Sequence, residues 1–250
     1  MAVRASKDVA FFLIGGFDVL GRLTQITDKV EAKIEDITAL GDTWITQAYV
    51  NMKNAEITQE GFFDDAANSV NDALSTGPGV ARVLCYGLEG TATGAAFMGW
   101  RSAMQVDYQR MFQRGELWKA KASYKTNGVV EQGRLLRPLN PTTTSGQTTG
   151  TPYDWATSAS GMSAYLQVSC ATQITSIAFD ILHSSDNITY ASAPFGFAAV
   201  TPAGTPTAQN KVTTTVVERY TAGRWAFTGA SANRTLTFMM GVSRDFPVGT

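Results

Sequence analysis

The chain has 250 residues, a length that allows one large domain or two modest ones, each with a real core. Its composition is 44% hydrophobic and 16% charged, which excludes disorder over the whole chain and is poor in charge for an ordinary enzyme. Lysine and arginine total 20 against 21 aspartate and glutamate, and the net charge of -1 disfavours a protein that grips nucleic acid by its phosphates.

Three segments within residues 1–137 alternate apolar and polar side chains, which predicts antiparallel strands with one covered face and one wet face. The expected covered faces carry Val30, Ala32 and Ile34; Trp100, Met104, Val106 and Tyr108; and Trp118, Ala120, Ala122 and Tyr124. The expected wet faces carry Glu31, Lys33 and Glu35; Arg101, Gln105, Asp107 and Gln109; and Lys119, Lys121 and Lys125. Residues 80–88 are apolar on both sides apart from Arg82, which predicts a more central strand.

One helix is predicted to interrupt these strands. Asp64 or Asp65 can cap a helix that runs from Ala66 to Leu74, and its apolar residues recur at helical spacing. The run Gly77-Pro78-Gly79 then ends the helix. We therefore predict a β-sandwich or partial barrel with one packed α-helix for residues 1–137.

Residues 138–152 are predicted to form a linker. The run from Pro138 to Pro152 consists almost entirely of Pro, Thr, Ser, Gly, Asn and Gln, which offer little apolar surface to offset the ordering entropy. Charged residues also become fewer beyond this run. Between Pro141 and Val217 the charged residues are Asp154, Asp180, Asp186 and Lys211.

Residues 153–250 are predicted to form a second, all-β domain. Alternating segments recur at 165–170, 177–181, 212–216, 225–227 and 236–242, and Ser184–Asn187 reads as a turn. Short strands at this spacing fit a β-sandwich of the immunoglobulin or jelly-roll kind. The fold class predicted for the whole chain is therefore mainly β.

No pattern of residues predicts an enzyme, a metal site or a cofactor. His183 is the one histidine and is expected at an exposed strand end, while Cys85 and Cys170 are expected as isolated, buried apolar side chains. Asp64, Asp65 and Asp186 could offer oxygen ligands to calcium, but a helix cap and a turn explain them more simply. No apolar run approaches the roughly 18 residues of a membrane helix, so no membrane partner is expected.

Two stretches carry a resemblance to a known family. The first is Glu35–Asp42, an acidic strand followed by an Ala-Leu-Gly-Asp turn, and the second is Lys53–Asp65, which ends in Gly-Phe-Phe-Asp before the predicted helix. Over residues 9–137 the chain resembles the tail tube proteins of long-tailed, siphovirus-like bacteriophages. The part after Pro152 looks like the accessory β-sandwich domains that some phage structural proteins carry outside the tube.

The resemblance implies a non-enzymatic virion protein, assembled in the host cytoplasm, whose copies form hexameric or pseudo-hexameric rings that stack into a tube for DNA ejection. It implies four partners: further copies of the chain, the tape measure protein, the tail terminator, and double-stranded DNA in transient passage. Glu31, Lys33 and Glu35 are the candidate lumen-lining residues, because acidic groups there would repel phosphates.

Trp44 and Tyr49 are candidate contacts between rings or subunits, although Trp44 fits an interior position equally well. The lysines at 33, 119, 121 and 125 either pair with acidic groups between subunits or are solvated outer charges.

Two alternative functions remain open from the sequence. One is another structural role in a phage particle, such as a head decoration or a minor tail protein. The other is a carbohydrate-binding surface module in which Tyr190, Tyr220 and Trp225 stack on sugar rings, although aromatic residues in a sandwich more often belong to its core.

Overall fold

The computed structural model describes residues 9–36, 47–66, 69–75, 79–126, 128–201, 206–228 and 234–244; for 32–36, 47–53, Cys170 and Phe195 it describes the backbone alone. Within these ranges the chain is mainly β, with antiparallel sheets, one short 3-10 turn and one short α-helix, which confirms the predicted fold class. The helical elements are η2 Leu20–Arg22 and α1 Val70–Ser75. The strands are β1 Phe12–Ile14, β2 Phe17–Asp18, β3 Leu23–Asp36, β4 Gln47–Phe62, β5 Ala81–Gly87, β6 Ala96–Met111, β7 Lys119–Thr126, β8 Val130–Thr142, β9 Gly146–Gln147, β10 Tyr153–Asp154, β11 Ala159–Thr172, β12 Ser176–Ser184, β13 Ala191–Gly196, β14 Thr207–Val217, β15 Tyr220–Thr228 and β16 Thr235–Ser243.

The N-terminal part is built on four strands in the order β3-β4-β7-β6. One face of this sheet is apolar and packs on β1, β2, β5 and α1. Its core residues include Ile57, Ala122, Tyr124, Leu74 and Trp100. Strand β5 lies between β1 and β6, so the predicted central strand is confirmed.

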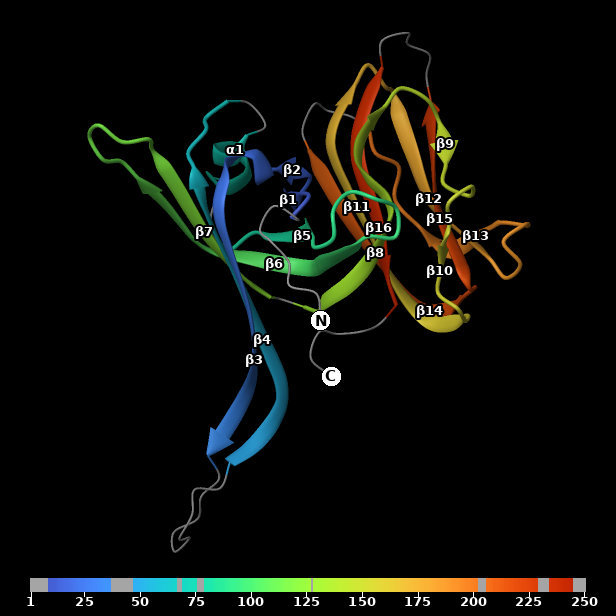
Figure 1. The fold of residues 1–250 in the computed structure, drawn as a ribbon, viewed down its shortest axis with the longest axis horizontal. Coiled ribbons are helices and arrows are strands. Elements are labelled where there is room, and N and C mark those ends of the chain that lie inside the picture. The colour runs from blue at the N-terminus through green and yellow to red at the C-terminus, as the bar shows by residue number, and fades with distance from the viewer. Residues whose placement is uncertain are drawn as a thin grey trace, which may run out of the picture.

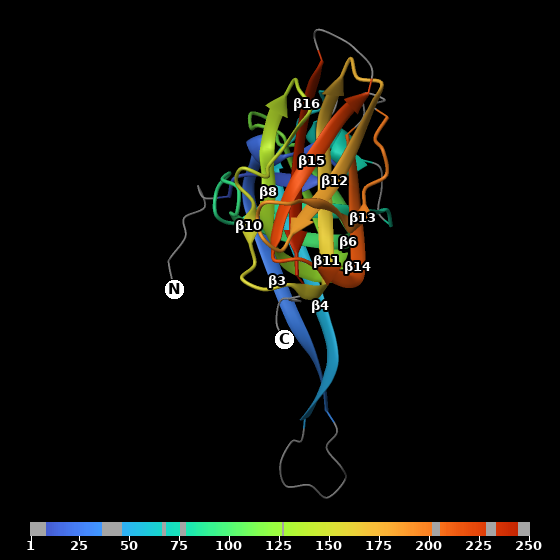
Figure 2. The same ribbon diagram turned by 90° about the vertical axis from the view of Figure 1, so that its right-hand side faces the viewer.

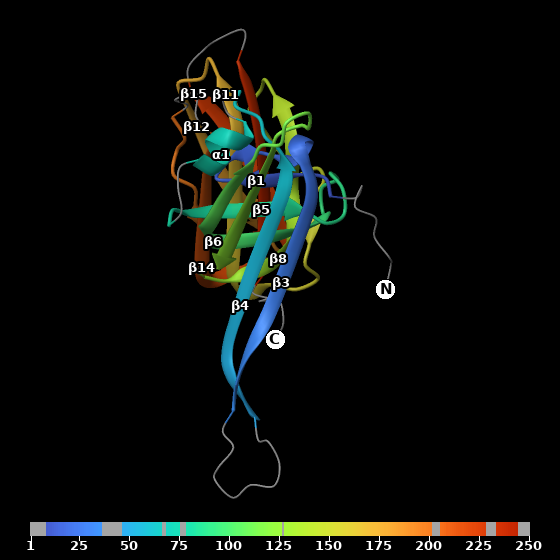
Figure 3. The ribbon, with the colours of Figure 1, turned by 90° about the vertical axis from the view of Figure 1, so that its left-hand side faces the viewer.

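Strands β3 and β4 continue well beyond their neighbour β7. Strand β7 pairs with Glu56–Phe62 of β4 only, whereas β3 pairs with β4 from Leu23 to Asp36. Residues 31–36 and 47–54, here called the arm, therefore form a two-stranded ribbon that projects away from the body (Figure 1, Figure 3). A ribbon of this kind is marginally stable on its own.

The C-terminal part is a two-layer sandwich. One layer has the order β14-β11-β16-β8, and the other has the order β10-β15-β12-β13 with β9 beside β15 (Figure 2). Aromatic side chains meet between the layers, where the Phe238 ring lies 5.0 Å from Phe179 and 5.3 Å from Trp225 between centroids. The strands predicted within 165–242 are confirmed.

The predicted linker is wrong over residues 138–142 and 146–147, which belong to β8 and β9. The N-terminal half of β8 pairs with β6, and residues 134–142 pair with β16. Strand β8 therefore belongs to both parts of the chain, and one sheet runs through them. The division into two domains at this point stays a prediction.

A buried ion pair lies where the two parts meet. Glu131 of β8 is fully buried and accepts hydrogen bonds from Arg101 of β6, from the Ser163 hydroxyl at 3.1 Å and from the Tyr165 hydroxyl at 2.7 Å, both on β11. Burial, followed by the adjacent carboxylate, raises the pKa of Tyr165 well above its ordinary value, which keeps its hydroxyl protonated as a donor. The Glu131 carboxylate thus links β8 to β6 and β11.

The helix start is set by Asp64, but four residues later than predicted, at Val70. The Asp64 carboxylate accepts the Ala66 N–H at 3.1 Å, and the Asp64 carbonyl accepts the Asn71 N–H at 2.9 Å. The hydrogen bond from Arg22 Nε at 2.7 Å is the main reason that the pKa of Asp64 is lowered. Asp64 therefore organises the approach to α1 and ties it to η2.

Candidate assembly surface

The face of the β3-β4-β7-β6 sheet that points away from the core is polar. The register aligns its side chains in rows across the strands: Lys29, Glu56 and Lys125; Thr27, Thr58, Ser123 and Asp107; and Gln25, Glu60, Lys121 and Gln109. The Thr58 and Ser123 hydroxyl oxygens lie 3.1 Å apart, which shows that the rows share one face. This surface is here called the polar face.

Charges on the polar face are balanced within one molecule. Its described acidic residues are Glu31, Glu56, Glu60 and Asp107, and its described basic residues are Lys29, Lys119, Lys121 and Lys125. Lys29 forms an ion pair with Glu31, and Lys119 Nζ lies 3.9 Å from Glu60. Cross-strand neighbours of opposite charge, such as Lys29 and Glu56, also favour the sheet. The polar face is therefore neutral and not acidic, and Lys119 has an acidic neighbour in its own chain.

The predicted lumen residues lie toward and along the arm. Glu31 is exposed at the arm end of the polar face. Lys33 and Glu35 follow it on β3, and Tyr49 pairs with Ile34 across the arm; only the backbone is described at these positions. Trp44 lies outside the described residues. Their roles in a lumen or between rings stay predictions.

Both edges of the four-stranded sheet are open in the described part of the chain. Strand β3 pairs only with β4, and residues 106–111 of β6 pair only with β7. Each edge carries an exposed valine, Val30 and Val106, at 38% exposure. Unpaired backbone groups and exposed valines are what a neighbouring strand would cover.

Val106 reaches this edge because a bulge separates Gln105 from Asp107. A second register irregularity separates Trp100 from Ala103, so the alternation is shifted between the two irregularities and the sequence prediction is wrong at three residues. Met104, predicted on the covered face, lies beside Lys125 on the polar face. Gln105 is buried and donates to the Leu74 carbonyl at 2.8 Å, while Val106 points outward. Beyond the bulge Tyr108 lies on the core side, opposite Ala122, and Asp107 and Gln109 lie on the polar face, so the inserted residue restores the predicted alternation.

An apolar cluster at the end of the β6–β7 hairpin was missed by the sequence analysis. It consists of Phe62, Phe63, Met111, Phe112, Leu117 and Trp118, here called the hairpin-end cluster. Trp118 was predicted on a covered face, but it precedes β7 and is 54% exposed. The apolar pairs Met111-Phe112 and Leu117-Trp118 on either side of the Arg114-Gly115 turn were the available signal.

The residues proposed for sugar stacking do not lie together on the surface. Trp225 is buried, donates its indole N–H to the Thr144 carbonyl at 2.8 Å and lies under the Arg137 guanidinium at 4.4 Å. The predicted surface contact is therefore wrong for Trp225. Tyr190 and Tyr220 are partly exposed, and burial, with Tyr220 nearby, raises the pKa of Tyr190.

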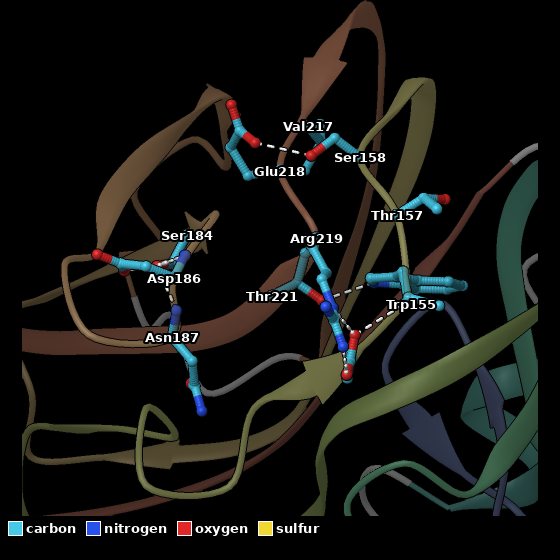
Figure 4. A network of polar contacts seen from close by, with 12 residues as sticks. Trp155, Thr157, Ser158, Ser184, Asp186, Asn187, Val217, Glu218, Arg219 and Thr221 are labelled. Atoms are coloured by element: carbon cyan, nitrogen blue, oxygen red, sulfur yellow. Dashed lines mark hydrogen bonds and ion pairs between the residues drawn. The ribbon is translucent and has the colours of Figure 1, made fainter.

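Polar residues around these tyrosines are occupied in holding strand ends together (Figure 4). Arg219 binds the Asp154 carboxylate through two hydrogen bonds of 2.6 and 2.7 Å, and Ser158 donates to Glu218 at 2.7 Å. The hydrogen bonds from Arg219 are the main reason that the pKa of Asp154 falls to about 2. Such mutual satisfaction is typical of a structural network.

No other group suggests chemistry in the described residues. Burial raises the pKa of Cys85 to about 12, so its thiol stays protonated, as expected for a buried cysteine. His183 accepts the Glu218 N–H at its Nδ1 atom, 3.1 Å away, near the end of β12. The described ranges contain no cluster of three metal-ligating side chains, and no helix in them combines the length and hydropathy that a bilayer crossing requires.

Asp186 supports a pH prediction. Its carboxylate accepts the N–H groups of Thr189 at 2.9 Å and Ile188 at 2.8 Å and the Ser184 hydroxyl, so its pKa is lowered to about 2. A carboxyl whose folded pKa lies below its ordinary 3.8 adds stability above pH 3.8 and loses it as the pH falls through about 2.

Asp186→Asn should therefore lower the melting temperature at pH 7, and its gap to the wild type should close between pH 3.8 and about 2. Thermal unfolding followed by circular dichroism measures the gap, with Asp65→Asn, at an exposed position, as the control. A gap that stays constant over this range would contradict the role of the charge.

Comparison with known proteins gives distant likenesses only. No protein-family model and no curated protein matches the chain. A chain from the virion of a native gene transfer agent particle has a TM-score of 0.40 and 14% identity, covering 52% of this chain and 98% of that chain. A chain from the tail of an empty particle of the same kind, refined with C6 symmetry, has a TM-score of 0.38 and 13% identity, covering 51% and 97%.

The SPP1 Dit protein, described as a paradigm of the hub adsorption apparatus in phages that infect Gram-positive bacteria, has a TM-score of 0.32 and 10% identity. The match covers 94% of this chain and 99% of that chain. Likenesses of this size do not establish a shared fold, so the function has to be inferred from the chain's own surfaces.

Proposed function

We propose that the chain is a non-enzymatic structural protein of a bacteriophage tail, a tube subunit whose copies form rings that stack around a DNA-conducting lumen. The observation that carries this proposal is the pair of open edges on the β3-β4-β7-β6 sheet. The sheet has an even number of strands, and each strand is antiparallel to the next. The β6 edge of one copy can therefore continue the antiparallel order along the β3 edge of the next.

Edge-to-edge pairing in a closed ring removes every unpaired edge, as in a barrel. A rotation that closes the ring keeps the same face of each sheet inward. We place the polar face on the inside, because the apolar face is already covered by β1, β5 and α1 of its own subunit. The arm, with Glu31, Lys33 and Glu35, then lies at one rim of the lumen.

A neutral polar face suits passage of double-stranded DNA. Lysines that already have acidic neighbours, as Lys119 and Lys29 do, release little energy on meeting phosphates. Tight DNA binding is thus avoided by charge balance and not by an acidic lining. Further proposed partners are the tape measure and tail terminator proteins, in a virion assembled in the host cytoplasm, with the sandwich facing outward.

The edges are tested by placing a charge on each. Val30→Lys and Val106→Lys should each abolish ring formation while leaving the fold intact, because a lysine on an edge strand opposes pairing with another chain. Val212→Lys is the matched control, an exposed valine on β14 at 47% exposure, in the sandwich. Sedimentation velocity and negative-stain microscopy of the purified full chain report the assemblies.

We expect rings for the wild type and for Val212→Lys, and monomers for the two edge variants. Wild-type protein that stays monomeric at every concentration, or edge variants that assemble as well as the control, would overturn the tube function.

A further inference from the structure

A half-buried arginine of the sandwich has no carboxylate partner among the described residues. The Arg137 guanidinium of β8 lies 4.4 Å from the Trp225 ring and 4.5 Å from the Phe238 ring. Its Nη2 donates to the Asn140 carbonyl at 3.1 Å, and its buried Nε has no acceptor in the described part of the chain. Burial lowers the pKa of Arg137, and no described acidic group opposes this effect. Because a guanidinium carries five N–H groups and buried charges are normally paired, Arg137 lacks acceptors.

A second arginine is held in the same way on the next aromatic ring of β15. Arg234 lies 4.8 Å from the Phe227 ring, and its Nε donates to the Thr143 carbonyl at 2.8 Å. Trp225 and Phe227 are two residues apart on β15, so they face the same side of the strand at a spacing of about 7 Å. Each of these neighbouring rings therefore carries one guanidinium, and Arg137 and Arg234 lie close together.

The segment between β8 and β9 presents hydrogen-bond donors beside these arginines. The carbonyls of Thr143 and Thr144 are engaged by Arg234 and by the Trp225 indole N–H. Thr143, Thr144 and Ser145 are exposed, and the Ser145 oxygen accepts a backbone N–H of β15 at 2.9 Å, which leaves its hydroxyl hydrogen free to donate. A place where acceptors are engaged and donors face the solvent suits an anion.

The charge of this corner stays positive when its neighbours are counted. Residues 134–149 and 225–240 contain three arginines and no acidic residue. One of the three, Arg134, is bound by Glu89 at 3.1 Å, and Asp180 of β12 is bound by the arginine opposite it on β15. Both acids therefore have partners of their own, and a formal charge of +2 remains on the two stacked arginines.

We propose that Arg137, Arg234 and the Thr143–Ser145 segment form a site for an oxyanion of the phosphate class. The planar guanidinium groups match the oxygens of a phosphate, and their stacking on rings fixes them before binding, so few rotations are lost. The bound oxygens supply the acceptors that Arg137 lacks in its own chain. The phosphate is either a free ion or a group on a polymer, and the site is independent of the tube function.

Titration of the full chain with inorganic phosphate at constant ionic strength, followed by phosphorus-31 NMR, tests the site. We expect saturable binding to the wild type and binding about tenfold weaker or more in Arg137→Gln and in Arg234→Gln, because each loses charge-assisted hydrogen bonds. Arg114→Gln is the matched control, because it removes the charge of an exposed arginine on the β6–β7 turn, away from the sandwich (Figure 1).

Two variants keep binding separate from folding. Arg137→Lys retains the positive charge over the rings but not the planar fork, so it should fold like the wild type and still bind phosphate several-fold more weakly. Arg234→Gln leaves Arg137 and its rings unchanged, so it decides the question even where Arg137→Gln unfolds. Circular dichroism checks the fold of each variant.

A polyphosphate chain distinguishes the two sources of the phosphate group. Binding about tenfold tighter than that of inorganic phosphate, at equal phosphate concentration, indicates a polymer that engages both arginines at once, whereas equal binding indicates the free ion. A wild type that binds neither, or an affinity that Arg114→Gln weakens as much as Arg137→Gln and Arg234→Gln do, would overturn the site and leave the tube function untouched.

Discussion

Replacing Glu131 by alanine should lower the free energy of unfolding by about 3–5 kcal/mol, the usual cost of breaking a buried ion pair by removing one partner. Glu131 is fully buried and binds Arg101 of β6 and Ser163 and Tyr165 of β11. Without its carboxylate, the Arg101 guanidinium would keep its charge in a site where only 22% of its side chain is exposed. Urea denaturation at pH 7 measures the change.

Two further variants show whether burial causes the effect. Glu131→Gln keeps the shape and an acceptor for the Tyr165 hydroxyl but loses the charge, so it should be less harmful than alanine and still clearly destabilising. Glu60→Gln removes a partly exposed partner of Lys119, 3.9 Å away, and should cost under about 1 kcal/mol. Equal losses in Glu131→Ala and Glu60→Gln would contradict the argument.

The destabilisation caused by Glu131→Ala should extend to both parts of the chain. The ligands of Glu131 lie on β6 and β11, and β8 itself pairs with both β6 and β16. Weakening this joint should affect the N-terminal core and the sandwich in one transition. Near-ultraviolet circular dichroism, which reports tryptophans in both parts, should follow the same curve as far-ultraviolet signals.

The sequence predicts the strands well where the alternation is uninterrupted. Segments 119–125, 165–170 and 236–242 lie within β7, β11 and β16, because alternate side chains in each are buried, as Ala120, Ala122 and Tyr124 are in β7. It fails at Val106, where a bulge shifts the phase, since no residue pattern marks a single inserted residue. The open β6 edge was therefore not predictable.

The prolines of the presumed linker misled the prediction for a physical reason. Pro141 lies in β8 opposite Thr237, and beyond Leu135 this strand pairs with β16. A proline lacks the N–H that a second neighbour would need, so it is tolerated where a strand has an open side. The composition correctly shows a weakly packing segment but cannot show that β16, almost 100 residues later, provides a partner.

The candidate surface was predictable only in part. The lysines and glutamates of β3, β4 and β7 could be placed on one face by their spacing, but their balance across strands needed the register. The hairpin-end cluster depends on which side of the β6–β7 turn stays uncovered. Such surfaces follow from the absence of neighbours, which local sequence does not encode.

Gly16→Ala should destabilise the protein by about 2–5 kcal/mol, the sum of a left-handed backbone and a backbone collision. Gly16 lies in the turn between β1 and β2 with φ +94°. A Cβ there would lie 2.4 Å from the Thr207 nitrogen and 2.6 Å from the Val168 carbonyl oxygen, so β14 and β11 would have to move. The Gly16 N–H also donates to the buried Gln167 amide at 2.6 Å.

Gly79→Ala separates the cost of the left-handed backbone from the cost of the collision, because Gly79 has φ +93° and its Cβ would meet nothing within 4 Å. It should cost only the backbone term, about 1–2 kcal/mol. The difference between the two variants, measured by urea denaturation, then reports how tightly the β1–β2 turn is pressed against the sandwich. Equal losses would mean that the β1–β2 turn can move away from β11 and β14 at little cost.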